Sequence, residues 1–338
     1  MSEWSLDQWS KEELLAELRH RQRSTSGATR AAGTAKGLHV ELHGVPTGRL
    51  AAALKDRQRV IYGTDDRQDL FAVKSKKVRG VSDAVAALVK AGDLQAKPGE
   101  GFDLRTTSYQ GEFDLCGNEP FASQPLGCFC SGFLVAPDVI ATAGHCVKSA
   151  ADLAGVRFVF GFRMKDAAVA NTTFGPDDVY EGKELIGRQM VGDGPDWALV
   201  RLQRAVVGRT PLAIRTSGKI RSNQAVFVIG HPNGLPAKYA PKAKVRDNAP
   251  GPFFVANLDT YGGNSGSPVF NSSSCKVEGI LVRGENDFVS DGTCNVSLVC
   301  PTTGCRGEDV TRATVWASKV PKARPKGKKR AVAARSSR

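Results

Sequence analysis

Short apolar runs dominate the chain from about residue 126 onwards. They are rich in β-branched and aromatic residues and are separated by Gly, Pro, Asn and Asp; examples are residues 132–145 (GFLVAPDVIATAGH), 156–164 (VRFVFGFRM), 196–202 (DWALVRL) and 225–232 (AVFVIGHP). Runs of this length and spacing predict the strands of an antiparallel barrel or sandwich, and they do not suit βαβ units. We therefore expect an all-β fold.

The region before these strands has a different pattern. A capping box begins at Ser10 and three leucines follow on one helical face, which predicts a helix over 10–22. Small and polar residues over 24–37 predict a linker. Further short helices are expected over 46–57, after a proline, and over 82–91, with a serine as the cap. The N-terminal part is thus predicted to be a small helical segment.

The net charge of +13 is unevenly distributed. Residues 318–338 hold nine basic and no acidic residues, whereas residues 60–317 hold 28 basic and 27 acidic ones. This predicts a nearly neutral folded domain at 60–317, a separate segment at 1–59 and a disordered basic tail. The tail is expected to be solvated, and the alternative is a weak contact with nucleic acid or another anionic surface. No apolar stretch reaches 18 residues, so we expect no membrane insertion.

Eight cysteines lie within the predicted domain, at positions 116, 128, 130, 146, 275, 294, 300 and 305. An even number indicates disulfides and an oxidising compartment, although the N-terminus lacks the long apolar run of a secretory signal peptide. Zinc is the alternative, but the sequence holds no C-x-x-C pair, and no cysteine pair is matched by a histidine pair at ligand spacing. We therefore expect no metal site and leave the compartment open.

Three residues have the chemistry of an activated nucleophile. Ser265 lies among glycines in GGNSGSP, and a serine hydroxyl is a weak nucleophile until a base removes its proton. His145 follows an apolar strand in ATAGHC and could be that base, while Asp196 begins the run DWALVRL and could orient the histidine. Taken singly, Ser265 suits a turn and Asp196 a strand start. The other candidate base, His231 in GHPNG, suits a turn histidine bonded to nearby backbone.

The order of the three residues strengthens the prediction. Histidine comes first, the acid follows 51 residues later and the serine 69 residues after that. This is the chymotrypsin order, and an α/β-hydrolase would instead present serine, acid and then histidine. An esterase of that fold is therefore disfavoured.

The segments TAGHC, DWAL and GNSGSP resemble the three signature segments of the chymotrypsin superfamily of serine endopeptidases. Within the superfamily, this chain is most similar to the bacterial glutamyl endopeptidase branch. Asn264 precedes the serine, and the sequence VIYGTDDR begins at Val60, as is typical of that branch. The resemblance covers about 60–310. It implies two antiparallel six-stranded β-barrels and no cofactor or catalytic metal, with a protein or peptide as substrate.

The resemblance also implies roles for individual residues. Ser265 would be the nucleophile, His145 the general base and then acid, and Asp196 the orienting carboxylate. The N–H groups of Gly263 and Ser265 would form the oxyanion hole. A disulfide of this spacing brackets the histidine in the family, which implies a bond between Cys130 and Cys146.

Primary specificity is predicted from a second set of positions. Asp259 lies six residues before the nucleophile, where trypsin-like members hold the aspartate that pairs with a substrate Arg or Lys. Leu281 stands where the glutamyl branch has its substrate-reading histidine. Arg283 could neutralise Asp259 or attract an acidic substrate. We expect a preference for a basic residue before the cut, and glutamyl specificity is the alternative.

Two further interpretations concern the whole chain. The family-like start at Val60 follows the basic sequence Arg57-Gln58-Arg59, which predicts that residues 1–59 are a pro-segment removed after Arg59. A helical accessory region that stays attached is the alternative. A catalytically inert, protease-like binding protein with a nucleic-acid-binding tail would predict a damaged triad or oxyanion loop, and both are complete in this sequence.

Overall fold

The structure is a computed structural model. Apart from Leu14 and Glu17, which are helical and buried, it describes residues 61–192, 194–283, 288–290 and 293–321, with backbone only at 289 and 290. The linker, the helix expected over 46–57, the site after Arg59 and the tail beyond residue 321 lie outside the described residues, as does the rest of the helix over 10–22. No helix in the described ranges is long and apolar enough to cross a membrane.

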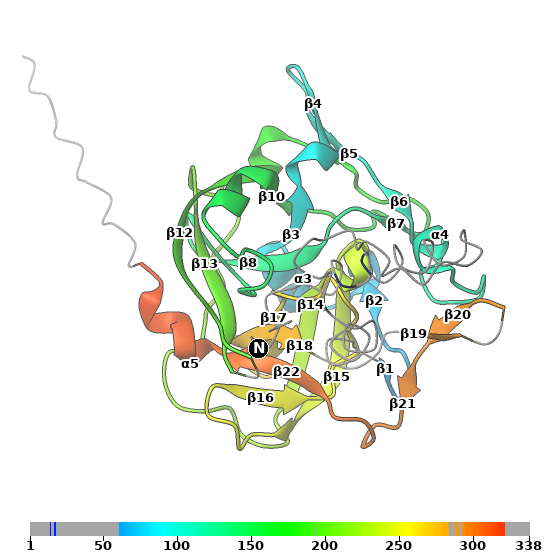
Figure 1. Cartoon of the computed structure of the whole chain (residues 1–338), viewed down its shortest axis with the longest axis vertical. Helices are drawn as coiled ribbons and strands as arrows, with labels where there is room; N and C mark the ends of the chain where they lie inside the picture. The colour runs from blue at the N-terminus through cyan, green and yellow to red at the C-terminus, as the bar shows by residue number, and fades with distance from the viewer. Residues whose placement is uncertain are drawn as a thin grey trace, which may run out of the picture.

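Two closed barrels form the body of the molecule (Figure 1). The first barrel contains, in order around the ring, β10 (Val156–Phe160), β12 (Val179–Met190), β13 (Asp196–Leu202), β9 (Val139–Thr142), β8 (Cys130–Ala136) and β3 (Val85–Lys90). The second contains β14 (Ala225–Gly230), β17 (Pro268–Asn271), β18 (Val277–Arg283), β22 (Glu308–Arg312), β16 (Phe253–Ala256) and β15 (Lys238–Asp247). A pairing of β14 with β15 closes the second ring, and both rings are antiparallel. The predicted pair of six-stranded barrels is confirmed.

Shorter elements surround the barrels. They are β1 (Ile61–Tyr62) paired with β21 (Val299–Cys300), β2 (Gln68–Asp69) on the edge of β15, β4 (Leu94–Lys97) and β5 (Gly101–Leu104) with β11 (Thr173–Phe174), β6 (Thr107–Ser108) with β7 (Pro125–Leu126), and β19 (Phe288–Ser290) with β20 (Asn295–Ser297). The α-helices are α3 (Lys76–Ser82), α4 (Tyr109–Phe113) and α5 (Ala313–Trp316). Single 3-10 turns lie at Leu70–Ala72, Ala91–Asp93, Ala151–Gly155, Pro176–Asp178, Pro232–Gly234 and Ala317–Lys319.

The helix expected over 82–91 is wrong, because Val85–Lys90 is strand β3 of the first barrel. Ser82 ends helix α3 instead of capping a new one. Alternate residues of β3 pack on opposite sides: Leu88 belongs to the large central core and Val89 to a separate apolar cluster. Both faces of the strand are therefore covered. A continuous apolar run of this kind does not distinguish a buried strand from a helix.

One apolar core joins the two barrels. The same cluster of buried side chains includes Phe133 of the first barrel, Phe227 and Phe270 of the second, and Trp316 of α5. Trp316 packs against Phe133 with ring centroids 6.0 Å apart and tilted planes. Because the barrels share this core, residues at the ends of their strands are held in fixed positions across the junction, where the candidate site lies.

Candidate active site

His145 and Asp196 are brought together by two strands of the first barrel. His145 follows β9, Asp196 begins β13, and these strands are hydrogen-bonded neighbours. Asp196 Oδ1 accepts the backbone N–H of Gly144 at 2.5 Å and that of His145 at 3.2 Å. A Cβ on Gly144 would lie 2.5 Å from the carbonyl oxygen of Gln189, so only glycine allows the backbone to approach this closely.

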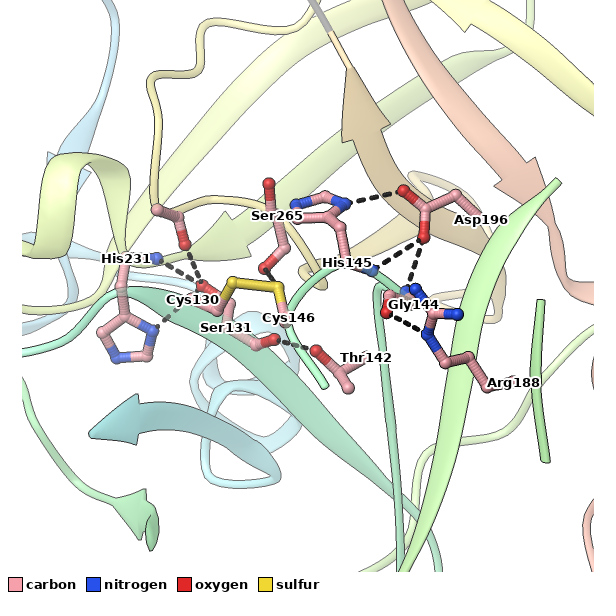
Figure 2. Close-up of a disulfide and its surroundings, with 11 residues drawn as sticks. Cys130, Ser131, Thr142, Gly144, His145, Cys146, Arg188, Asp196, His231 and Ser265 are labelled. Atoms are coloured by element: carbon pink, nitrogen blue, oxygen red, sulfur yellow. Dashed lines mark hydrogen bonds and ion pairs between the residues drawn. A yellow bond between two sulfur atoms is a disulfide. The ribbon is translucent and has the colours of Figure 1, made fainter. Parts of the chain in front are cut away.

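The second oxygen of Asp196 binds the imidazole. Oδ2 lies 2.6 Å from His145 Nδ1, and the carboxylate is 2% exposed (Figure 2). Burial alone would raise the pKa of Asp196, but the His145 ring, Arg283 and the Gly144 amide together hold that pKa below its usual value. The carboxylate is thus ionised at neutral pH. Because an ionised carboxylate can only accept a hydrogen bond, Nδ1 carries the proton and donates it to Asp196 Oδ2. The opposite ring nitrogen is left as the basic atom.

Ser265 reaches the histidine from the second barrel. Figure 2 shows its side chain pointing toward the imidazole of His145 on the side opposite Asp196. Its backbone carbonyl accepts the N–H of Ser131 on β8 at 2.8 Å. Asp196 is also tied across the junction, since its N–H donates to Thr311 Oγ1 on β22 at 3.1 Å. The three residues with nucleophile chemistry therefore meet between the barrels.

The backbone around Ser265 turns sharply at two glycines. Gly263 has φ +73° and Gly266 has φ +88°, a region that favours glycine. A Cβ on Gly263 would lie 2.6 Å from the carbonyl oxygen of His231. Within the described ranges, the N–H of Gly263 donates to no protein acceptor.

Cys130 and Cys146 form a disulfide next to His145, the pairing that the resemblance implied. The Cys130 and Cys146 sulfurs and a His145 ring nitrogen lie within 4.8 Å of one another, which is metal-ligand spacing. Because the two sulfurs are bonded to each other, neither is a thiolate that could ligate a metal ion. Two further disulfides join Cys116 to Cys294 and Cys300 to Cys305, whereas Cys128 and Cys275 are thiols.

Asp259 is buried and contacts strand β1. Its Oδ1 accepts the backbone N–H of Tyr62 in β1 at 2.7 Å. Burial raises the pKa of Asp259 to about 7, with further increases from Asp66 and Asp65, while the Tyr62 amide and Arg67 act in the opposite direction. Asp259 is therefore partly protonated near neutral pH.

The other two predicted specificity residues have different surroundings. Leu281 is fully buried in the apolar cluster inside the second barrel, so its side chain has a packing role. Arg283 Nε donates to Asp309 Oδ2 at 3.0 Å, and its terminal nitrogens donate to the carbonyls of Gly192 and Gly194 at 3.1 and 2.8 Å. The guanidinium is thus engaged by Asp309 and by the turn before Asp196.

Several residues at the site carry no signal in the sequence. Ser131 and Thr311 are ordinary strand hydroxyls, Asn233 lies in a turn, and Arg188 donates from Nε to the carbonyl of Gly144 at 2.6 Å. Each is distant along the chain from the residue it binds. Only the barrel topology brings them together, so no local motif could have identified them.

Comparison with known proteins finds a similar domain in one part of the chain. Residues 130–280 match the family model of the trypsin-like peptidase domain. No curated protein matches the chain. Among solved structures, a Glu endopeptidase in complex with MPD is 18% identical, with a TM-score of 0.43, over 76% of this chain and 96% of that one. The Vibrio cholerae VesB protease is 14% identical, with a TM-score of 0.46, over 77% of this chain and 66% of that one.

Proposed function

We propose that the chain, which matches the trypsin-like peptidase domain over residues 130–280, is a serine endopeptidase with His145, Asp196 and Ser265 as its catalytic triad. The observation that supports this most is the 2.6 Å contact between Asp196 and His145 Nδ1, with the Ser265 side chain on the far side of the ring. Such an arrangement directs the basic ring nitrogen toward the hydroxyl. A protein or peptide is the substrate class.

The proposed reaction begins with proton transfer. His145 takes the hydroxyl proton of Ser265 while Oγ attacks the carbonyl carbon of the scissile peptide bond. The carbonyl π electrons move to oxygen, and the N–H groups of Gly263 and Ser265 receive the oxyanion. When the tetrahedral intermediate collapses, the C–N bond breaks and His145 gives its proton to the leaving amine. An acyl group then remains on Ser265.

A water molecule then hydrolyses the acyl group, and Ser265 becomes the leaving group. His145 removes a proton from water as the oxygen attacks the acyl carbon, and it returns that proton to Ser265 Oγ as the acid product leaves. Asp196 stays ionised throughout and stabilises the imidazolium. The residues supply every proton transfer that both halves require.

Cleavage of an unstructured protein substrate tests this function. The purified enzyme should release peptides, and Ser265→Ala should remove nearly all of that activity. Ser272→Ala is a matched control, because Ser272 is an exposed serine just beyond β17 of the same barrel. Near wild-type turnover by purified Ser265→Ala would contradict the proposal, and inactivity of both variants would point to a folding defect.

We further propose that Asp259 favours a basic residue before the cut. Its carboxyl is 5% exposed, and its pKa is raised further by Asp65 and Asp66, which are themselves paired with Arg67 and Lys242. A cationic side chain entering this region would stabilise the buried carboxylate, whereas a glutamate would add to the repulsion. A peptide library with Arg, Lys, Glu or Asp before the bond distinguishes the two preferences. Cleavage only after Glu would contradict this assignment and favour the glutamyl alternative.

Removal of residues 1–59 also remains a proposal. Support comes from Tyr62, three residues after the predicted cut, whose N–H binds the Asp259 carboxylate. The chain that follows the cut is thus part of the region expected to read the substrate. Intact-mass analysis of active enzyme should find an N-terminus at Val60. Fully active enzyme that still begins before Lys55 would contradict processing here.

A further inference from the structure

Ser131 bonds to both residues of the proposed oxyanion hole. It lies on β8 of the first barrel and is fully buried. Its N–H donates to the carbonyl of Ser265 at 2.8 Å, and its Oγ donates to the carbonyl of Gly263 at 3.0 Å. Figure 2 shows Ser131 lying between His231 and the Cys130–Cys146 disulfide. One residue of the first barrel therefore holds the nucleophile loop of the second at two points.

His231 contacts the Ser131 hydroxyl through both its backbone and its ring. The backbone N–H of His231 donates to Ser131 Oγ at 3.0 Å and Nδ1 lies 3.3 Å from the same oxygen, while Oγ donates to the carbonyl of Gly263 at 3.0 Å. The His231 ring is 1% exposed and stacks on Phe162 with centroids 5.9 Å apart. Burial lowers the pKa of His231 to about 3, so this histidine stays neutral while the enzyme is folded.

Asn233 holds the peptide group that joins Gly262 to Gly263. Its backbone N–H donates to the carbonyl of Gly262. In a trans peptide the C=O and the following N–H point in opposite directions, so this bond turns the N–H of Gly263 away from Asn233. Asn233 has φ 52°, and its side-chain amide donates to Tyr109 Oη at 3.2 Å, which anchors the turn to α4.

We propose that Ser131 and the turn at residues 231–234 are positioning groups that hold the N–H of Gly263 in the orientation required for an oxyanion hole. The inference rests on the proposed serine endopeptidase function. Neither Ser131 nor the turn is placed against the substrate; both act through the loop. Donors fixed before the reaction stabilise the developing charge without reorganising, so their loss should affect the transition state more than substrate binding.

The test replaces the hydroxyl and follows turnover per active site. Ser131→Ala should lower kcat about 10- to 100-fold with KM nearly unchanged, less than the loss of a whole oxyanion donor. A peptide aldehyde forms a hemiacetal oxygen in the same hole, so its inhibition constant should weaken by a similar factor. The pH profile of kcat/KM should stay unchanged, because His145 and Asp196 keep their contacts.

A matched control removes a buried serine hydroxyl elsewhere. Ser82 Oγ donates to the carbonyl of Arg79 at 2.7 Å, so its hydroxyl bonds within its own helix, α3. Ser82→Ala should change stability alone. Ser131→Cys retains the shape of the side chain but has only a weak hydrogen-bond donor, so it should also lose turnover. This variant replaces Ser131→Ala in the test if the alanine variant does not fold.

Two results would overturn the inference. One is a kcat per titrated site in Ser131→Ala or Ser131→Cys within twofold of wild type. The other is unchanged aldehyde affinity. A lower melting temperature with normal turnover per site would assign Ser131 a structural role only. Failure here is distinguishable from failure of the proposed function, because Ser265→Ala would still be inactive.

Discussion

The two barrels hold their parts of the site in different ways. In the first barrel, His145 and Asp196 lie at the ends of neighbouring strands and bind each other directly. In the second, Ser265 lies on a loop with left-handed glycines, and the loop carbonyls bind Ser131 of the first barrel and Asn233 of a turn. The contact between His145 and Asp196 is thus made within one barrel, with Thr311 of the second barrel bonding the Asp196 N–H, whereas the position of the nucleophile loop depends on how the barrels pack together.

The largest loss of turnover is expected when the contact between Asp196 and His145 in the first barrel is removed. Asp196→Asn should lower kcat by about 10⁴, because the amide would favour the wrong histidine tautomer. The double variant Asp196→Asn with His145→Ala should lose little more than His145→Ala alone, since triad members are non-additive. Single-turnover rates of the three variants measure this. If the fold loss of the double variant equals the product of the two single-variant losses, the residues act independently and the prediction is wrong.

A smaller loss is expected from the second barrel's loop. Gly263→Ala would force a side chain into φ +73° and against the carbonyl of His231, so the oxyanion N–H should be displaced. We expect kcat to fall by about 10²–10³. Gly251→Ala is the control, because Gly251 is exposed and nothing lies within 4 Å of its added Cβ. Equal activity of the two variants would contradict a constrained loop.

The pocket acid should give a moderate effect that depends on pH. Asp259 ionises as pH rises through about 7, because burial raises its pKa. The ratio of kcat/KM for an Arg substrate to that for an uncharged substrate should increase about tenfold between pH 6 and 8. Effects of pH that are common to both substrates cancel in this ratio. Asp259→Asn should make the ratio flat, and a wild-type ratio that falls with pH would refute the assignment.

The smallest effect on turnover is expected for the Cys130–Cys146 disulfide, which constrains the first barrel. Replacing both cysteines by alanine should lower the free energy of unfolding by about 3 kcal/mol, because the bond closes a loop of 16 residues. The Cys300–Cys305 bond closes only five residues, and its loss should cost about 2 kcal/mol. Denaturant titration compares the pairs. A larger loss for the short loop would show that loop closure does not dominate.

The sequence predicted those features that depend on local patterns. His145, Asp196 and Ser265 each lie beside a recognisable strand or glycine turn, and their order along the chain indicated a barrel protease. The run at Val85–Lys90 was misread as helix because its apolar residues are continuous, and only packing on both faces makes it a strand. Ser131 gave no signal, since Gly263, to which its hydroxyl donates, lies 132 residues away along the chain.

Charged partners were the hardest to predict. The pairing of β18 with β22 places Arg283 beside Asp309, a contact that the sequence did not indicate. Leu281, two residues earlier, packs in the apolar cluster inside the second barrel. Register between distant strands decides such contacts, and a sequence pattern does not specify that register.

Identification of the nucleophile tests the central claim most directly. The native enzyme is treated with a fluorophosphonate, digested and mapped by mass spectrometry. We predict one adduct, on the peptide that contains Ser265, formed in proportion to the loss of peptidase activity, slowed strongly in His145→Ala and absent in Ser265→Ala. Complete inhibition with the adduct on another residue, or full labelling of Ser265 with activity retained, would contradict the account.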